Sequence, residues 1–317
     1  MGQRKRTIKD WIIATRPWSF PASSIPIIAM GSYFYYLHAS TGEPFDWVSV
    51  LLALPMMMLF QAGGNLVSDA ADHEHKVDLP GSLNGVRHIQ DGQFTAQGSR
   101  HYGFTLLGLA TLIGLLILWR IFTLQGSTHA MPVISYLSGA IGLTGIALAV
   151  WYPTIKYHAL GDLDILLCYA LLPSIGLDMV ATGHVHYATL LLCLPFGLQT
   201  VAILHANNTR DIRNDRRAGI QTLPHVIGGK ASQWLYAAEV LLPYVLIAVY
   251  FLMGLAPVWT LLAWAVFPIA VKNARWMMSV PEEEEQGIAT LDQKTAQMQL
   301  FTGLLYALGF LIGAFLA

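Results

Sequence analysis

Two short stretches of the chain each carry amide side chains and two carboxylates at three- and four-residue spacings. The residues are Asn65, Asp69 and Asp72 in the first motif, and Asn207, Asn208, Asp211 and Asp215 in the second. Such spacings place side chains on one face of a helix, where like charges repel unless a cation lies between them. Carboxylate and amide oxygens are ligands that Mg²⁺ accepts when it also holds a phosphate. The two motifs therefore predict a magnesium site that binds a diphosphate.

Basic residues accompany both motifs. Arg87 lies in the Gly-containing loop after the first motif, Arg210 lies within the second, and Lys156 follows Tyr152 in a central loop. A single loop lysine is most often only a marker of the cytoplasmic side of a membrane. Beside two carboxylate motifs, however, these three side chains are suited to contact phosphate oxygens and to stabilise a departing diphosphate.

The composition indicates a membrane protein. The chain is 55% hydrophobic and only 12% charged over 317 residues, which is typical of a multi-spanning helical protein and gives no indication of nucleic-acid binding. Cys168 and Cys193 both fall in apolar segments without a metal-ligand spacing, so we expect them to be packing residues.

About 20 apolar residues are needed for a helix to cross a bilayer, and nine segments meet this criterion by inspection. They are 18–38, 47–68, 102–122, 131–151, 162–182, 187–207, 232–254, 257–278 and 296–317. The sequence thus predicts an all-α bundle of nine transmembrane helices around a central cavity.

The lysines and arginines predict the orientation of these helices. Apart from Arg120, they fall in the amino-terminal segment and in alternate loops, which places the amino terminus in the cytoplasm and the carboxyl terminus outside. The two motifs end the second and sixth predicted helices, so both face the cytoplasm. This predicts two parallel four-helix repeats plus one helix in a single domain. Its expected parts are a basic segment 1–17, the repeats 18–158 and 159–278, and a final part 279–317.

With these motifs the chain resembles membrane-embedded prenyltransferases of the UbiA superfamily. The matching patterns are Asn65-x-x-x-Asp69-x-x-Asp72, Arg87 with Gly92, Tyr152-x-x-x-Lys156 with Gly161, and Asn208-x-Arg210-Asp211-x-x-x-Asp215 followed by Gly219 and Thr222-Leu223. Three stretches particularly resemble the branch that prenylates 1,4-dihydroxy-2-naphthoate in menaquinone biosynthesis: Trp11-x-x-x-x-Arg16-Pro17, Asn65-Leu66 and Asn207-Asn208-x-Arg210-Asp211.

The resemblance implies the roles of individual residues. Asn65, Asp69 and Asp72 on one wall, and Asn208, Asp211 and Asp215 on the other, would hold Mg²⁺ with the diphosphate of a polyprenyl donor. Lys156, Arg87, Arg210 and the two asparagines would contact the diphosphate, and Lys156 would act with the four aspartates in catalysis. An aromatic acceptor would then attack the allylic cation, and dihydroxynaphthoate would lose carbon dioxide, giving demethylmenaquinone. The implied location is the cell inner membrane.

Two positions depart from the family pattern. Ile220-Gln221 stands where members often carry a basic residue, and Asp162 stands where Glu is common after Gly161. Both leave the acceptor open, so 4-hydroxybenzoate, homogentisate and glycerol phosphate remain alternatives.

Two other classes of membrane protein fit the sequence less well. A cation-coupled secondary transporter would place its binding site near the bilayer midplane rather than at the cytoplasmic ends of helices. CDP-alcohol phosphatidyltransferases carry a single Asp-rich motif of a different pattern and have no need for a second copy.

Overall fold

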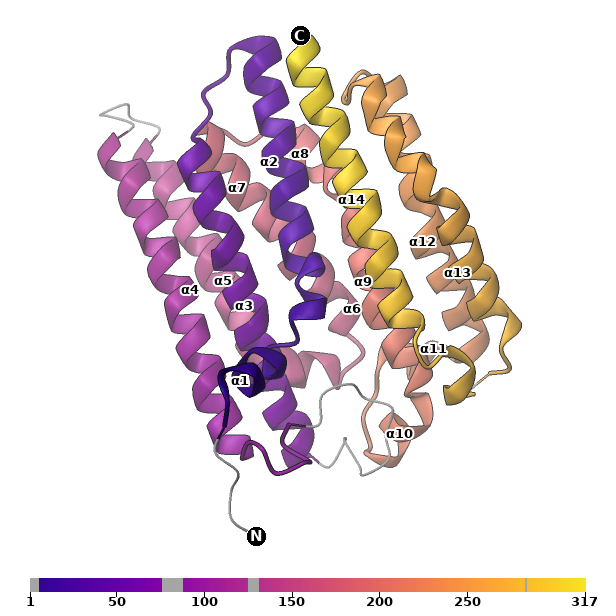
Figure 1. The fold of residues 1–317 in the computed structure, drawn as a ribbon. Coiled ribbons are helices and arrows are strands. Elements are labelled where there is room, and N and C mark those ends of the chain that lie inside the picture. The colour runs from indigo at the N-terminus through magenta and orange to yellow at the C-terminus, as the bar shows by residue number, and fades with distance from the viewer. Residues whose placement is uncertain (1–5, 76–87, 125–130, 283) are drawn as a thin grey trace.

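The computed structural model describes residues 6–75, 88–124, 131–282 and 284–317. Within these ranges the regular elements are all helices, and long antiparallel helices form one bundle (Figure 1). The elements are α1 Ile8–Ala14, η1 Pro17–Ser19, α2 Pro21–Thr41, α3 Trp47–Glu74, α4 Ala96–Leu124, α5 Met131–Lys156, α6 Gly161–Leu166, η2 Leu167–Leu171, α7 Leu172–Thr182, α8 Tyr187–Leu192, α9 Leu194–Arg210, α10 Ile212–Arg217, α11 Leu223–Ile227, α12 Gly229–Leu252, η3 Val258–Val266, α13 Phe267–Ser279, η4 Glu285–Ile288 and α14 Leu291–Leu316.

Among the described residues, seven helical segments are long and apolar enough to cross a membrane, so the chain is a multi-pass membrane protein. They are Trp47–Glu74, Ala96–Thr123, Val133–Lys156, Gly161–Thr182, Tyr187–Arg210, Gly229–Leu252 and Gln286–Leu316. Two of the nine predicted segments do not meet this standard. Segment 18–38 corresponds to α2, whose apolar pattern is interrupted by Ser23, Ser24 and Ser32. Segment 257–278 is divided between the 3-10 helix η3 and the 13-residue helix α13.

Close approach of helix backbones positions α3, the helix that carries the first motif. A Cβ atom on Gly63 of α3 would lie 2.8 Å from the carbonyl oxygen of Gly103 of α4, and a Cβ on Gly103 would lie 2.8 Å from the carbonyl oxygen of Gly63. Only glycine allows this spacing, as is common where membrane helices pack. The neighbouring Gly64 has no atom within 4 Å of its Cβ direction.

The second motif does not lie on one continuous helix. The predicted row of Asn207, Asp211 and Asp215 is interrupted, because α9 ends at Arg210 and α10 begins at Ile212. Backbone hydrogen bonds from Asp211 N–H to the Asn207 carbonyl at 3.0 Å and from Asp215 N–H to the Asp211 carbonyl at 2.9 Å bridge this bend. The three residues therefore keep nearly helical spacing even though the axis changes.

The two ends of the bundle differ in character. The motif-bearing ends of α3 and α9 lie at the end of the bundle where the amino terminus is drawn, and the carboxyl terminus lies at the other (Figure 1). Arg120, which departs from the pattern of basic residues, is at that other end and donates to both Asp46 carboxylate oxygens at 3.0 and 3.1 Å. Burial acts to raise the pKa of Asp46, but hydrogen bonds from Arg120 and Ser49 outweigh it and the pKa is lowered. The positive charge of Arg120 is therefore paired with a carboxylate at that end of the bundle.

Candidate active site

A cavity of about 630 Å³ opens among the helix ends that carry both motifs. Polar residues of α3, α5, α6, α9, α10 and α14 line it together with apolar residues of α3, η2, α9 and α14. The polar lining includes Gln61, Asn65, Ser68, Asp72, Tyr152, Lys156, Asp164, Asn207, Asn208, Arg210, Asp211, Asp215, Asp292 and Gln293. Residues of both motifs therefore face one shared space.

Two residues of the first motif line the cavity. Asp72 accepts a hydrogen bond from the Tyr157 hydroxyl at 2.7 Å and lies 3.5 Å from the Lys156 ammonium. The Asn65 amide donates to the Thr15 carbonyl at 3.3 Å and to the Ser19 hydroxyl at 3.2 Å. Both contacts use the amide nitrogen of Asn65, so its side-chain oxygen is not occupied by these two hydrogen bonds.

Asp69 is not among the residues that line the cavity. Its buried carboxylate forms an ion pair with Arg16, which itself lines the cavity. The backbone of Arg16 has φ 55°, an unfavourable left-handed conformation for a residue with a side chain. The ion pair and a hydrogen bond from the Ser19 hydroxyl to the Arg16 carbonyl at 2.8 Å hold it there. Arg16 therefore stands between Asp69 and the cavity.

His88 lies on the other side of Asp69. Its Nδ1 is 3.9 Å from the Asp69 carboxylate, and its Nε2 is 3.1 Å from the Ser99 hydroxyl. Burial and the charge of Arg16 lower the pKa of His88 to about 4. The imidazole is consequently neutral at pH 7 and contributes no ion pair to Asp69.

Arg210 donates hydrogen bonds to side chains of the second motif and of α14. Its guanidinium donates to both carboxylate oxygens of Asp211 at 2.9 and 3.0 Å, to Asp292 of α14 at 3.1 Å, and to the side-chain oxygen of Asn207. A fork of this kind fixes the orientation of a carboxylate. Asn208, the asparagine predicted to bind metal, is buried and also lines the cavity.

Asp215 completes the second wall. The Thr222 hydroxyl donates to its carboxylate at 3.0 Å. Burial raises the pKa of Asp215 to about 6, although the charge of Lys156 opposes this shift. A carboxylate in this position is costly to ionise without a nearby cation.

Lys156 links the two walls. Its ammonium interacts electrostatically with the carboxylates of both Asp72 and Asp215. The next residue, Tyr157, accepts a hydrogen bond at its carbonyl from the Gln221 N–H at 3.2 Å. Gln221, one of the positions that depart from the family pattern, thus contacts the segment that follows α5. This backbone hydrogen bond joins that segment to the loop after the second motif.

Arg87, the remaining predicted phosphate ligand, lies outside the described residues. Sequence reasoning also overlooked four residues around the cavity: Arg16 as a partner of Asp69, Tyr157, Asp164 and Asp292. Asp164 is buried, lines the cavity and has an Oδ1 atom without a hydrogen-bond partner among the described residues. Asp164 lies two residues after Asp162 in the first turn of a helix. In the sequence it therefore has the same pattern as a carboxylate that only caps a helix.

The cavity also has apolar and aromatic lining residues. Its lining includes Phe60, Ile203, Leu204 and Leu300, together with Tyr169 on the π-helical turn η2. Such turns inside longer helices are frequent at functional sites. The cavity therefore combines a carboxylate-rich part with a surface suited to hydrocarbon.

The donor set fits Mg²⁺. Asp72, Asp211, Asp215, Asn65 and Asn208 present hard oxygen donors to one space, and Mg²⁺ prefers carboxylates together with phosphate oxygens and water. Lys156 and Arg210 contact these carboxylates as well. A divalent cation with a diphosphate is thus chemically compatible with the residues present.

Comparison with known proteins defines the class. A model of the UbiA prenyltransferase family matches residues 25–291, so the chain belongs to this family and is a transferase of prenyl groups. The "UbiA prenyltransferase domain-containing protein 1 homolog" of Drosophila melanogaster is 31% identical over 94% of this chain and 78% of its own length. The human "UbiA prenyltransferase domain-containing protein 1" is also 31% identical, over 96% of this chain and 83% of its own.

Solved structures share the fold at lower identity. A digeranylgeranylglyceryl phosphate synthase has a TM-score of 0.55 and 17% identity, covering 96% of this chain and all of the other. A UbiA homologue from Archaeoglobus fulgidus, bound to GPP and Mg²⁺, has a TM-score of 0.55 and 13% identity over 94% of this chain and 99% of its own.

Proposed function

We propose that the protein transfers a polyprenyl group from polyprenyl diphosphate to 1,4-dihydroxy-2-naphthoate, with loss of carbon dioxide and diphosphate, to give the quinol form of demethylmenaquinone. The observation that carries the proposal is the convergence of Asp72, Asp211 and Asp215 with Lys156 on one cavity that also has apolar lining residues, among them Phe60, Ile203, Leu204 and Leu300. This arrangement suits a donor with a diphosphate at one end and a hydrocarbon chain at the other.

In this proposal Asp72, Asp211, Asp215, Asn65 and Asn208 hold Mg²⁺, and Asp69 supports them through Arg16. The metal supplies charge neutralisation for the diphosphate and for the negative charge that develops on it. A UbiA homologue bound to DMAPP and Mg²⁺ supports this assignment by analogy of fold.

The chain's own groups would then promote cleavage and exclude water. As the allylic carbon–oxygen bond breaks, its electron pair leaves with the diphosphate, and Lys156 and Arg210 stabilise the added charge. The aromatic faces of Tyr152, Tyr169 and Phe60 stabilise the allylic cation. A ring carbon of the acceptor forms the new bond, and the carboxylate carbon departs as carbon dioxide.

We also propose that α2 and the η3–α13 pair cross the bilayer beside the seven apolar spans, which would give nine. α2 packs along α14, and α14 packs along η3, so all three belong to one bundle. Residues 18–158 and 159–278 would form the parallel repeats, and the motif end would face the cytoplasm of a cell with this protein in its inner membrane.

A product assay tests the function directly. Purified protein is incubated with polyprenyl diphosphate and a panel of 1,4-dihydroxy-2-naphthoate, 4-hydroxybenzoate, homogentisate and glycerol phosphate, and products are identified by mass spectrometry. We expect prenylated, decarboxylated naphthoate only when Mg²⁺ or a similar ion is present. Consumption of another acceptor alone would overturn the naphthoate assignment and leave the prenyl transfer intact.

Variants of one aspartate in each motif test the proposed Mg²⁺–diphosphate site separately. Asp69→Asn and Asp211→Asn are expected to lower turnover by about 10² or more, the scale of losing one preorganised electrostatic group. Glu74→Gln is the matched control, because Glu74 lies at the end of the same helix as Asp69 but is exposed. Full activity of both aspartate variants, or of the wild type after chelation, would contradict the proposal.

A further inference from the structure

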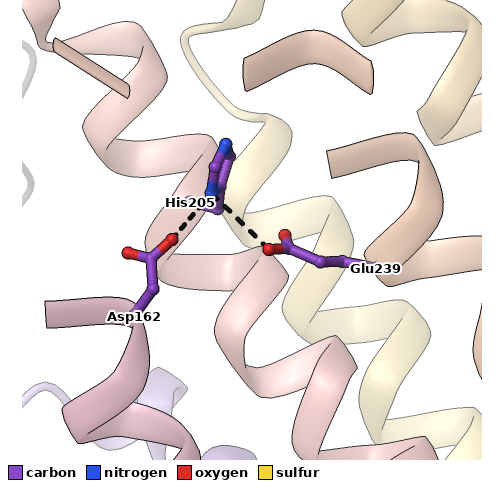
Figure 2. A group of neighbouring side chains, drawn as sticks. All are labelled: Asp162, His205 and Glu239. Atoms are coloured by element: carbon purple, nitrogen blue, oxygen red, sulfur yellow. Dashed lines mark hydrogen bonds and ion pairs between the residues drawn. The ribbon is translucent and has the colours of Figure 1, made fainter. Parts of the chain in front are cut away.

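A second cluster of ionisable side chains lies inside the bundle, apart from the cavity. Asp162 of α6, His205 of α9 and Glu239 of α12 point toward one another (Figure 2). Their exposed fractions are 7%, 0% and 5%. None of the three lines the cavity described above, so the proposed transfer reaction makes no use of them.

The imidazole of His205 is held from both sides. Its Nδ1 lies 2.7 Å from Asp162 Oδ2 and 3.6 Å from Glu239 Oε1 (Figure 2). Its Nε2 lies 2.8 Å from the Ser232 hydroxyl, which in turn lies 2.5 Å from the Thr209 hydroxyl. When Nε2–H donates to Ser232, the Nδ1 lone pair faces two carboxylates.

With both carboxylates ionised, the described residues do not balance the charges of this cluster. Among the described residues, the ion pairs of Asp162 and Glu239 within 4.0 Å are with His205 alone. In the described part of the chain, buried Asp162 Oδ1 and Glu239 Oε2 have no hydrogen-bond partner. An imidazolium supplies one positive charge for two carboxylates, and burying the remaining charge unpaired is expensive.

The arrangement of donor atoms matches a metal site. One oxygen from each carboxylate and one imidazole nitrogen all lie within 4.8 Å of one another. A second interaction at the other ring nitrogen, here with Ser232, is the usual way in which a protein orients a metal-binding histidine. A divalent ion with a neutral imidazole would cancel both carboxylate charges.

We propose that Asp162, His205 and Glu239 bind a divalent transition-metal ion of the Zn²⁺ type. Imidazole and carboxylate donors suit Zn²⁺, whereas Mg²⁺ prefers an all-oxygen environment with retained water. The ion would join α6, α9 and α12, and α9 carries His205 only three residues before Asn208. The site would thus connect three helices close to the second motif. It is distinct from the proposed Mg²⁺ site that binds the diphosphate.

Metal analysis of the full-length protein tests the proposal without an activity assay. Protein purified with Zn²⁺ and then dialysed is expected to retain about one Zn²⁺ per chain by mass spectrometry of the elements. Glu239→Gln and His205→Gln should lose it, and Ser232→Ala should weaken Zn²⁺ affinity at least about tenfold. Asp211→Asn should retain it, which separates this site from the proposed diphosphate site.

Substitution with Co²⁺ identifies the ligands. Wild-type protein loaded with Co²⁺ should show visible absorption bands that disappear in His205→Gln. Glu239→Gln is nearly isosteric, so its folding is verified by gel filtration and thermal unfolding before the metal is measured. Wild type that holds no Zn²⁺ or Co²⁺, or a folded Glu239→Gln variant that holds as much as wild type, would overturn the proposal in favour of a buried imidazolium between two carboxylates.

Discussion

At the scale of single residues, Lys156 places a positive charge between carboxylates of both motifs. Its ammonium is 3.5 Å from Asp72 and also acts on Asp215. A compact ammonium between two carboxylate groups can shift its contacts toward an anion when one enters. Loss of this group should therefore affect the charged transition state more than the folded bundle.

Lys156→Met is expected to lower kcat by about 10² to 10³ in the product assay, with little change in thermal unfolding. Lys230→Met serves as the control, because Lys230 lies on the exposed start of α12. A Lys156→Met enzyme within twofold of wild type would remove Lys156 from the mechanism.

Asp164 is the buried carboxylate of the cavity that belongs to neither motif. Its Oδ1 atom is buried and has no hydrogen-bond partner among the described residues, so a hydroxyl group of an acceptor bound beside it would supply the missing donor. Asp164→Asn should raise the KM for the acceptor about tenfold, the scale of one charged hydrogen bond, and leave the KM for the donor unchanged. Equal changes in both constants would contradict a role in acceptor binding.

At the scale of elements, the contact between α3 and α4 determines where the first motif lies. Gly63 and Gly103 bring the two backbones together, and α3 then continues to Glu74 so that Asn65, Asp69 and Asp72 share one helix. Dense packing transmits any increase in side-chain volume into a shift of the helix.

Gly103→Ala should destabilise the protein by about 1–3 kcal/mol and lower transfer activity by displacing α3. Gly108→Ala on the same helix is the control, since no atom lies within 4 Å of its Cβ direction, and it should be neutral or slightly stabilising. Thermal unfolding in detergent and the product assay measure both effects. Equal behaviour of the two variants would contradict the packing argument.

At the scale of the whole molecule, both motifs and the amino-terminal helix α1 lie at one end of the bundle (Figure 1). Among the basic residues that predict a cytoplasmic orientation, Arg100 at the start of α4, Arg210 at the end of α9 and Arg217 at the end of α10 belong to helix ends there. His73 and Arg217 are exposed there, whereas His184 is exposed in the segment between α7 and α8 at the other end.

Labelling of single introduced cysteines tests which end of the bundle faces the cytoplasm. In right-side-out vesicles, an impermeant thiol reagent should modify a cysteine that replaces His184 but not one that replaces His73 or Arg217. Inside-out vesicles should give the reverse pattern. The native Cys168 and Cys193 are buried and should remain unreactive, and labelling of positions 73 and 184 from the same side would contradict the orientation.

Much of the bundle and part of the site could be predicted from the sequence. Apolar runs predicted the seven spans to within a few residues at most ends, because bilayer thickness determines helix length. The spacing of Asn65, Asp69 and Asp72 predicted a shared helix face, because helical geometry is local. The motifs and the family they indicate likewise depend on residue types at short separations.

The tertiary structure alone decided which of these groups meet. Arg16 reaches Asp69 from another element, Asp164 faces the cavity, and Asp162, His205 and Glu239 come together from three helices. Such contacts depend on the rotation and crossing of packed helices, which spacing along one helix does not specify. The sequence by itself therefore determined the chemistry of the two motifs and their placement at helix ends, whereas packing decided that Asp69 stands behind Arg16 and that a second cluster lies beside α9.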